Sequence, residues 1–437
     1  MATEDATSLE ARLLCLFREF GIKRAHIAAR MDSDWQGFTA ANGDCVASLS
    51  LLCPMTLDAR AVAPMAPRLL VVAGDRGAAA ERVRTASAAI GGAVSAILPN
   101  YEGVMWSDVV AERGTEISAI MLDFLRQTDL PPLRPTERVG EAAGISYHIC
   151  GAGPPLLLMP LLLAPSQWAP IVPTLAEHYC TIELGGAFLG IVAMLEARGR
   201  SIYLGMIRTL LDAAQIRTGE TVLDIGCGSG VVIREVARQT AGRNPLIGVD
   251  LSPYLLREAA QLARRDGRGE MIELREGRAE ALPLADNSVD VALSCTVKEE
   301  GDAERMLGEM TRVTRPGGRI GVVVRAVDMH ESVNLPLSAK AKVEAPGVFG
   351  AGVVPAGCAD ATLYDRFRAA GLTQLKLFPQ LTAVTPDDPR FPMFEQQALA
   401  VLQDDEIAEW QRAVAKGKAD GTLFVAMPHH CAVGTKS

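Results

Sequence analysis

The sequence predicts an α/β protein made of two domains, each with a mainly parallel sheet. Short apolar runs alternate with stretches of helical periodicity along most of the chain. The apolar run Thr221–Ile225 breaks into glycines at alternate positions directly before a helical pattern, and the proline-rich segment Leu130–Pro135 has the composition of a linker. A chain of 437 residues that is 49% hydrophobic can bury two cores of this kind.

Composition excludes several classes of function. The formal net charge of −9 argues against a nucleic-acid-binding surface, which needs clustered lysine and arginine. The longest apolar run, Leu156–Ala164, is too short to span a bilayer and is interrupted by Pro160, so we expect a buried strand and no membrane span. Because no N-terminal secretory pattern is present, we expect a cytoplasmic protein.

The nine cysteines are odd in number, widely scattered and never spaced as C-x-x-C. This pattern favours reduced thiols over disulfides, and we expect no metal site.

Residues 1–135 alternate predicted helices and strands. The helices cover Leu9–Phe20 and Ile117–Leu125, and the strands cover Arg24–Ala29, Val46–Pro54 and Arg68–Asp75. This order resembles the second half of an α/β-hydrolase, from the nucleophile strand to the last helix.

The residues that a hydrolase needs are missing from this region. The nucleophile motif G-x-S-x-G has no counterpart in Ala29–Asp34, where Ser33 is a candidate nucleophile or simply a polar loop residue. Asp75 lies where the family's acid often lies, but the segment Pro99–Trp106 contains no histidine. A Ser-His-Asp relay cannot work without its base, so the resemblance implies an inactive domain.

Residues 136–190 resemble the first strands of the same hydrolase family, which normally precede the part already described. Neither piece has enough strands for a sheet of its own, so we predict that they form one circularly permuted hydrolase-like domain. In that domain Leu156–Met159 should lie in the same sheet as His26–Ala28. The alternative is that one piece packs on a partner subunit in a homodimer.

The glycines at 226, 228 and 230 predict a ligand-binding loop. Glycine permits positive φ angles and close approach of the backbone to a ligand at the N-terminus of the next helix. A dinucleotide fingerprint would place its third glycine at Val231, so the spacing differs from that motif.

Four blocks in order resemble the class I S-adenosyl-L-methionine (SAM)-dependent methyltransferases: Thr221–Gly230, Pro245–Asp250, Glu280–Thr296 and Leu307–Val324. The resemblance implies that residues 191–437 form a Rossmann-like seven-stranded sheet that binds SAM. Its last strand should be Leu423–Gly434, antiparallel to its neighbours. Within the family, the sequence is similar to the quinone-biosynthesis-type and natural-product enzymes.

The resemblance also implies the cofactor-binding residues. Asp250 ends the second strand, about 20 residues past the loop, where it would accept hydrogen bonds from the ribose. Arg278 stands where the family usually has an adenine-binding aspartate, so we expect the backbone of Ala279 to serve instead. Tyr203 and Arg198, on a helix before the loop, are candidates for the cofactor carboxylate or the acceptor pocket, or have a structural role. The full set is Asp224, Gly226, Cys227, Gly228, Gly230, Asp250, Leu251, Ala279, Glu280, Ser294 and Tyr203.

Methyl transfer from a sulfonium is an in-line displacement, so the protein mainly aligns the acceptor and excludes water. A general base helps if the acceptor is a hydroxyl or an amine, and the candidates are His330, His429 and His430, together with Glu331. Adjacent residues on a strand point to opposite faces, so at most one of His429 and His430 enters the pocket, and a structural role is the alternative.

The sequence thus predicts methyl transfer from SAM to a small-molecule acceptor, through O, N, C or S. The hydrolase-like domain would bind the acceptor or mediate dimerisation. A non-enzymatic SAM-responsive binding module is the alternative, and an active hydrolase is disfavoured by the missing base.

Overall fold

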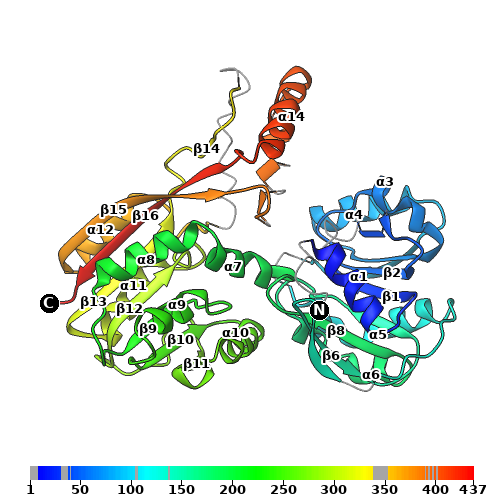
Figure 1. The fold of residues 1–437 in the computed structure, drawn as a ribbon, viewed down its shortest axis with the longest axis horizontal. Helices are drawn as coiled ribbons and strands as arrows, with labels where there is room; N and C mark the ends of the chain where they lie inside the picture. The colour runs from blue at the N-terminus through cyan, green and yellow to red at the C-terminus, as the bar shows by residue number, and fades with distance from the viewer. Residues whose placement is uncertain are drawn as a thin grey trace. The chain divides into compact units, whose positions relative to one another are not determined.

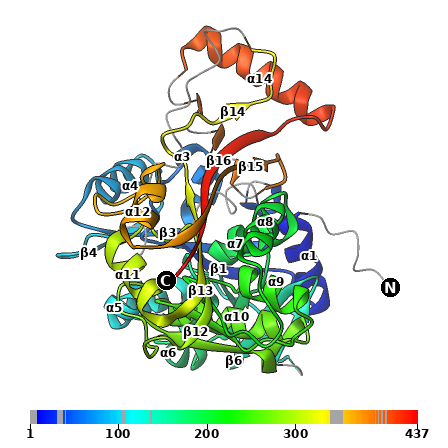
Figure 2. The same ribbon diagram turned by 90° about the vertical axis from the view of Figure 1, so that its left-hand side faces the viewer.

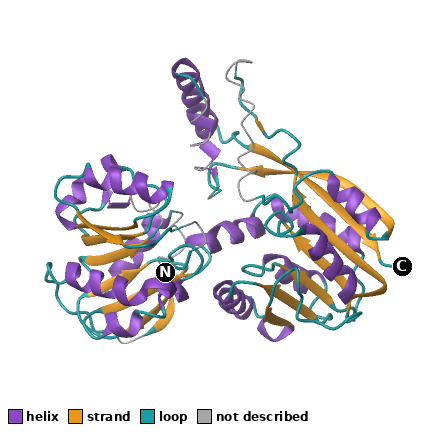
Figure 3. Cartoon of the chain, turned by 180° about the vertical axis from the view of Figure 1, so that it is seen from behind, coloured by secondary structure: helices purple, strands orange, loops and turns teal. Residues whose placement is uncertain are grey.

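The computed structural model divides into two compact units, Met1–Ala193 and Met194–Ser437, here the N-terminal and C-terminal units (Figure 1). In each unit the strands form a sheet with helices packed on it (Figure 3). The structure describes residues 8–30, 38–39, 41–103, 107–135, 138–337, 353–388, 390–391, 394–395, 398–399 and 402–437.

Eight strands form the sheet of the N-terminal unit, counted over its described residues, in the order β4-β3-β2-β1-β7-β8-β6-β5. All neighbours are parallel except β6, which is antiparallel to both β8 and β5. The strands are β1 (Ala25–Ala29), β2 (Val46–Leu52), β3 (Leu69–Gly74), β4 (Val94–Leu98), β5 (Val139–Ala142), β6 (Ile145–Cys150), β7 (Pro155–Leu158) and β8 (Cys180–Gly185).

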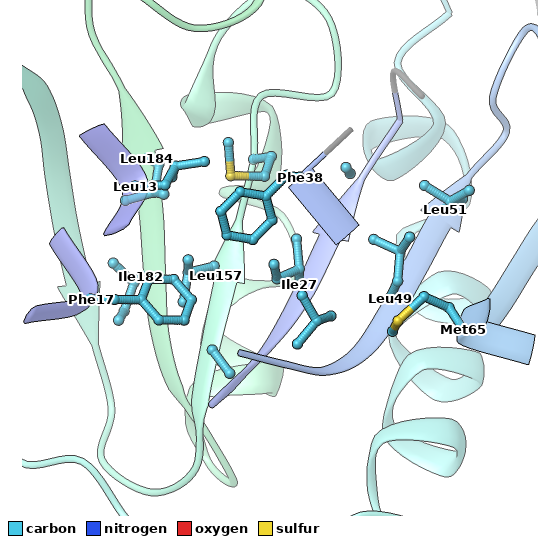
Figure 4. Packing of buried hydrophobic residues seen from close by; sticks show 14 of the residues in the cluster. Leu13, Phe17, Ile27, Phe38, Leu49, Leu51, Met65, Leu157, Ile182 and Leu184 are labelled. Carbon is cyan, nitrogen blue, oxygen red and sulfur yellow. The ribbon is translucent and has the colours of Figure 1, made fainter. Parts of the chain in front are cut away.

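Strands from both sides of the proline-rich segment share this sheet. β7 pairs with β1, with Leu156 opposite His26, and with β8 on its other side. Leu157 and Ile182 pack in the same cluster as Ile27 and Leu49 (Figure 4). The prediction that Leu156–Met159 joins the sheet of His26–Ala28 is therefore confirmed.

Helices cover both faces of the N-terminal sheet. On one face, α1 (Leu9–Glu19) and α4 (Ala78–Ala88) contribute to a core with the inward residues of β1 and β2. On the other, α5 (Val109–Leu125) and α6 (Val172–Ala176) close a second core. Because both faces are covered, β1, β2 and β3 are buried at every position, including the polar residues His26, Ser48 and Ser50.

The sheet of the C-terminal unit has the order β11-β10-β9-β12-β13-β16-β14, and β15 also pairs with β16. It therefore has eight strands over its described residues rather than the expected seven, and two-residue β14 at its edge is the shortest of them. The strands are β9 (Val222–Ile225), β10 (Leu246–Asp250), β11 (Ile272–Glu276), β12 (Val289–Cys295), β13 (Thr314–Arg325), β14 (Ser332–Val333), β15 (Thr373–Val384) and β16 (Val425–Thr435). β16 is antiparallel to β13 and β15, which confirms the predicted direction of the last strand. β15 and β16 run side by side in both views (Figures 1 and 2).

On one face of this sheet lie α8 (Tyr203–Ala214) and α9 (Val231–Gln239), and on the other α11 (Ala303–Val313) and α12 (Thr362–Ala369). Among the described residues there are also α7 (Gly190–Arg200), which begins at the end of the N-terminal unit, α10 (Pro253–Arg265) and α14 (Asp404–Ala419). α14 packs through Trp410 and Val414 in a separate hydrophobic cluster, which also contains Val384 at the end of β15 and Val425 at the start of β16.

The segment Pro316–Gly318 interrupts the pairing of β13 with β12. β13 already pairs with β12 at Thr314, and the register between the two strands then jumps from Thr314 to Arg319. Gly317, at φ +77°, lets the intervening residues bulge out of the strand.

No described helix is both long enough and apolar enough to cross a membrane. All nine cysteines are free thiols.

Candidate functional site

The glycine loop joins β9 to α9 at the carboxyl edge of the C-terminal sheet. The N–H groups of Gly226 and Cys227 both donate to the Val249 carbonyl, at 2.8 and 3.0 Å, which fixes the loop against β10. Gly230, at φ +86°, is the N-cap of α9. The backbone of the loop therefore lies at the N-terminus of α9, where backbone N–H groups can bind a polar ligand.

Two glycines are required by their surroundings. At Gly226, φ is +68° and a Cβ would lie 2.3 Å from a methyl of Val297. At Gly228, φ is +53° and a Cβ would lie 3.0 Å from a methyl of Leu195. Larger residues would be strained in this conformation and would also push on the side chains above the loop.

Asp224 carries a buried carboxylate beside the loop. The residue is 1% exposed, and its Oδ2 has no hydrogen-bond partner among the described residues. Burial, and secondarily the nearby Asp250 carboxylate, raise the pKa of Asp224 to about 8. A cation placed against this oxygen would favour the ionised form of the carboxyl group.

A small hollow opens beside Asp224 and the glycine loop. Its walls include Leu195 and Arg198 of α7, Tyr203 of α8 and Cys295 at the end of β12. Cys227 and Gly228 contribute the loop side. Among the predicted cofactor-binding residues, the structure thus brings Asp224, Gly226, Cys227, Gly228 and Tyr203 around one space.

Tyr203 is nearly inaccessible and lies between two other candidates. The Arg198 guanidinium stands 5.1 Å from the centre of its ring, and the His429 ring meets it edge-on at 5.7 Å. Its hydroxyl has no hydrogen-bond partner within the described residues, and burial raises the pKa of Tyr203 to about 12. Arg198 also donates to Oγ1 of Thr296 at 3.0 Å.

Asp250 links β10 to the glycine loop. Its Oδ2 accepts from the Gly228 N–H at 2.8 Å, and its Oδ1 accepts from the Ser252 N–H at 2.9 Å. Burial raises the pKa of Asp250, while these two N–H donors oppose that rise. Each oxygen keeps a further lone pair for a ligand hydroxyl.

The other predicted cofactor residues lie farther along the same edge. Leu251 is 57% exposed directly after β10, and Ala279 and Glu280 are half-buried after β11. The Arg278 side chain is 61% exposed. Ser294 is buried within β12, but its neighbour Cys295 is the β12 residue that lines the hollow.

The structure separates the three histidines. His429 is 1% exposed and faces Tyr203, and burial lowers the pKa of His429 to about 3. His430 faces the opposite side, where its ring nitrogens lie 2.8 Å from Asp328 and 2.9 Å from the Tyr364 hydroxyl. The alternation expected of a strand is confirmed for this pair. His330 is exposed.

Sequence reasoning missed Glu299, which follows β12. It is fully buried, one carboxylate oxygen accepts from the Arg325 N–H at 2.8 Å, and the other has no partner in the described part of the chain. Burial raises its pKa, and the nearby Arg325 and Arg198 oppose that rise. Ligands of α/β sheets bind at the carboxyl ends of strands. The charged run Lys298–Glu300 follows such an end, and this position is the sequence feature from which Glu299 could have been chosen as a candidate.

Comparison with known proteins gives a match in this region. Residues 222–318 match the family model described as a methyltransferase domain. The chain is 35% identical over 126 residues to an arsenite methyltransferase of Halobacterium salinarum, covering 28% of this chain and 32% of that protein. It is 31% identical over 141 residues to the ubiquinone/menaquinone biosynthesis C-methyltransferase UbiE of Hahella chejuensis, covering 30% of this chain and 57% of that protein. A demethylmenaquinone methyltransferase of Desulfitobacterium hafniense is 32% identical over 117 residues, covering 26% and 46%.

The chain therefore spans from about a third to a little over half the length of these relatives. Among solved structures, the YcgJ protein of Bacillus subtilis superposes with a TM-score of 0.38 at 17% identity, over 53% of this chain and 98% of that one. A geranyl diphosphate methyltransferase in complex with SAM gives a TM-score of 0.33 at 17% identity, over 53% of this chain and 85% of that one.

Proposed function

Residues 222–318 belong to a methyltransferase domain that uses SAM as methyl donor, and we propose that the protein transfers this methyl group to a small-molecule acceptor. The observation that carries the proposal is the Asp224 carboxylate beside the glycine loop, whose Oδ2 has no partner in the described part of the chain. SAM bears an ammonium group, which is the kind of cation that this buried oxygen would pair with.

The residues at the sheet edge fit the rest of the cofactor. Asp224 would hold the ammonium, and Asp250 would accept from the ribose hydroxyls with the lone pairs that Gly228 and Ser252 leave free. The glycine loop would let the backbone approach the cofactor closely, because Gly226 and Gly228 carry no side chain. Leu251, exposed beyond Asp250, is suited to cover the adenine.

SAM supplies a methyl group on a sulfonium, which a nucleophile displaces in line. The chain's part is to align the acceptor and keep water out. We assign the acceptor side to Tyr203 and Arg198, which line the hollow, and to His429, whose ring packs edge-on against Tyr203. The low pKa keeps His429 neutral, so it would orient a polar acceptor by hydrogen bonding rather than carry a charge.

Relatives named for menaquinone and arsenite methylation suggest a small-molecule acceptor but no single one. Of the other two predicted histidines, His430 has both ring nitrogens engaged and His330 is exposed, which leaves His429 as our choice.

We also propose that the N-terminal unit is a circularly permuted, inactive α/β-hydrolase-like domain that binds the acceptor or mediates dimerisation. From its β5 edge the sheet runs β5-β6-β8-β7-β1-β2-β3-β4, so the later part of the chain supplies the first four strands, as the proposed permutation requires. The predicted boundaries 1–135, 136–190 and 191–437 belong to this proposal.

The edge where a hydrolase would hold its nucleophile is occupied by Arg30. This residue is 2% exposed and donates to the carbonyls of Cys53 and Ser107, at 3.2 and 2.5 Å. Asp75 accepts from the N–H groups of Asn100 and Tyr101, which supports a structural role for it. Ser33, the sequence candidate for a nucleophile, lies outside the described residues.

Calorimetry on the full-length protein tests the cofactor proposal. We expect SAM and S-adenosylhomocysteine to bind and NAD not to bind. Tight binding of NAD without binding of SAM would overturn it.

A further inference from the structure

Three metal-ligating side chains meet in the N-terminal unit, far along the chain from the glycine loop. His148 and Cys150 alternate along β6 and therefore share one face of the sheet, and Glu183 of β8 is the register partner of His148. His148 Nδ1 lies 2.8 Å from Glu183 Oε1, and Cys150 Sγ lies 3.8 Å from His148 Nε2. One nitrogen, one sulfur and one oxygen all fall within 4.8 Å of one another.

The charge balance of this cluster leaves room for a cation. The Glu183 side chain is only 8% exposed. Within the described residues its one ion-pair partner is His148, which is charged only when protonated. A buried carboxylate without a permanent cation is costly, and a metal ion would compensate it.

The cluster is also accessible. The His148 side chain is 54% exposed and Cys150 is partly exposed, so an ion could enter from solvent without opening the core. No local pattern in the sequence points to the cluster, because Glu183 lies 35 residues from His148 and no C-x-x-C spacing is present.

We propose that His148, Cys150 and Glu183 bind a divalent transition metal, Zn²⁺ being the best match, with a fourth position open to water. Imidazole nitrogen, thiolate sulfur and carboxylate oxygen are the ligands that zinc takes in proteins. With bonds of about 2.0 Å to nitrogen and 2.3 Å to sulfur, neighbouring ligands of a tetrahedral site lie roughly 3.3 to 3.8 Å apart.

The present spacing needs little change to meet that geometry. The sulfur stands 4.0 Å from Nδ1, the ring nitrogen that faces Glu183, and the 2.8 Å hydrogen bond between that nitrogen and Glu183 must open to about 3.3 Å. On binding, the Cys150 thiol loses its proton to solvent and the metal replaces the proton shared by His148 and Glu183. The bound ion would tie β6 to β8, so it should raise the melting temperature of this unit.

The test uses full-length protein, kept reduced and stripped of metal with a chelator, then titrated with Zn²⁺ by calorimetry and with Co²⁺ by absorption. We expect one ion per chain and a sulfur-to-cobalt charge-transfer band. Cys150→Ser should abolish the band, and His148→Ala and Glu183→Gln should each weaken Zn²⁺ binding by at least about tenfold.

Matched controls separate this site from adventitious binding by other thiols and imidazoles. Cys45→Ser changes a free, partly exposed thiol elsewhere, and His178→Ala changes an exposed histidine, so both should bind like the wild type. Each variant must melt like the wild type without metal. Absence of stoichiometric binding, or equal binding by well-folded Cys150→Ser and His148→Ala proteins, would overturn the proposal.

Discussion

The N–H of Gly228 donates to Oδ2 of Asp250 at 2.8 Å, so the glycine loop and the carboxylate at the end of β10 are held as one piece. The same Asp250 carboxylate contributes to the raised pKa of Asp224. Two carboxyl groups thus flank the loop, and both should respond when a cationic, hydroxyl-bearing ligand binds.

The affinity for S-adenosylhomocysteine, which carries the same ammonium as SAM, should rise with pH between about 6 and 8. The pKa of Asp224 is raised to about 8 in the ligand-free protein, so most molecules must lose a proton before they can pair with the ammonium. Each unit of pH well below 8 should change the affinity by about tenfold, as calorimetry in matched buffers can measure.

Stability should respond in the opposite direction. Since the folded pKa of Asp224 lies above its usual value of 3.8, the stability that Asp224 contributes to the folded protein is present below about pH 4 and is lost as pH rises through about 8.

Asp224→Asn should weaken the binding of S-adenosylhomocysteine and remove the pH dependence of that binding. If this variant kept the wild-type dependence of affinity on pH, a group other than Asp224 would be responsible for that dependence.

Gly226→Ala should lower the free energy of unfolding of the C-terminal unit by roughly 2 to 4 kcal/mol. A positive φ costs a non-glycine residue about 1 to 2 kcal/mol, and the new Cβ would overlap Val297. Gly205→Ala is the matched control, because Gly205 lies exposed in α8 with nothing near its Cβ position, and it should be neutral or slightly stabilising.

Chemical denaturation measures both variants. Val297→Ala should restore part of the stability lost in Gly226→Ala, since it removes the overlapping methyls. Equal stability of the Gly226→Ala and Gly205→Ala proteins would contradict the packing described for the loop.

The parts that the sequence predicted well are those encoded locally. The loop glycines, the carboxylate that ends β10 and the alternation of His429 and His430 follow from short-range pattern and strand geometry. The pairing of β7 with β1 could also be predicted, because neither fragment had enough strands alone.

What the sequence could not supply depends on packing between distant segments. Val297 and Leu195 lie outside the loop in sequence, and their side chains leave little room for a Cβ at Gly226 and Gly228. The environment of the Glu299 carboxylate depends on where the fold buries it. The bulge at Gly317 arises from its register with β12, which no local pattern specifies. The partnership of His148 with Glu183 is likewise a product of strand pairing.

The N-terminal unit should show no serine-dependent esterase activity. No histidine occurs in Pro99–Trp106 to act as the base, and Arg30 occupies the edge where the proposed hydrolase-like domain would hold its nucleophile. Wild type and Ser33→Ala should therefore hydrolyse p-nitrophenyl acetate at the same slow rate. A burst of nitrophenol that disappears in Ser33→Ala would refute the assignment of an inactive domain.

Asp250→Ala should weaken SAM binding by at least about tenfold. In the proposed site the carboxylate would accept two hydrogen bonds from the ribose, each worth roughly 1.5 to 3 kcal/mol, and about 1.4 kcal/mol already corresponds to a factor of ten. The substitution also removes the acceptor for the Gly228 and Ser252 N–H groups, so the variant's melting without ligand must match that of the wild type. Arg278→Ala is the control, because that side chain is 61% exposed and we assign adenine recognition there to the backbone of Ala279. If well-folded Asp250→Ala bound SAM as tightly as the wild type while Arg278→Ala did not, the cofactor would lie elsewhere along the sheet edge than proposed.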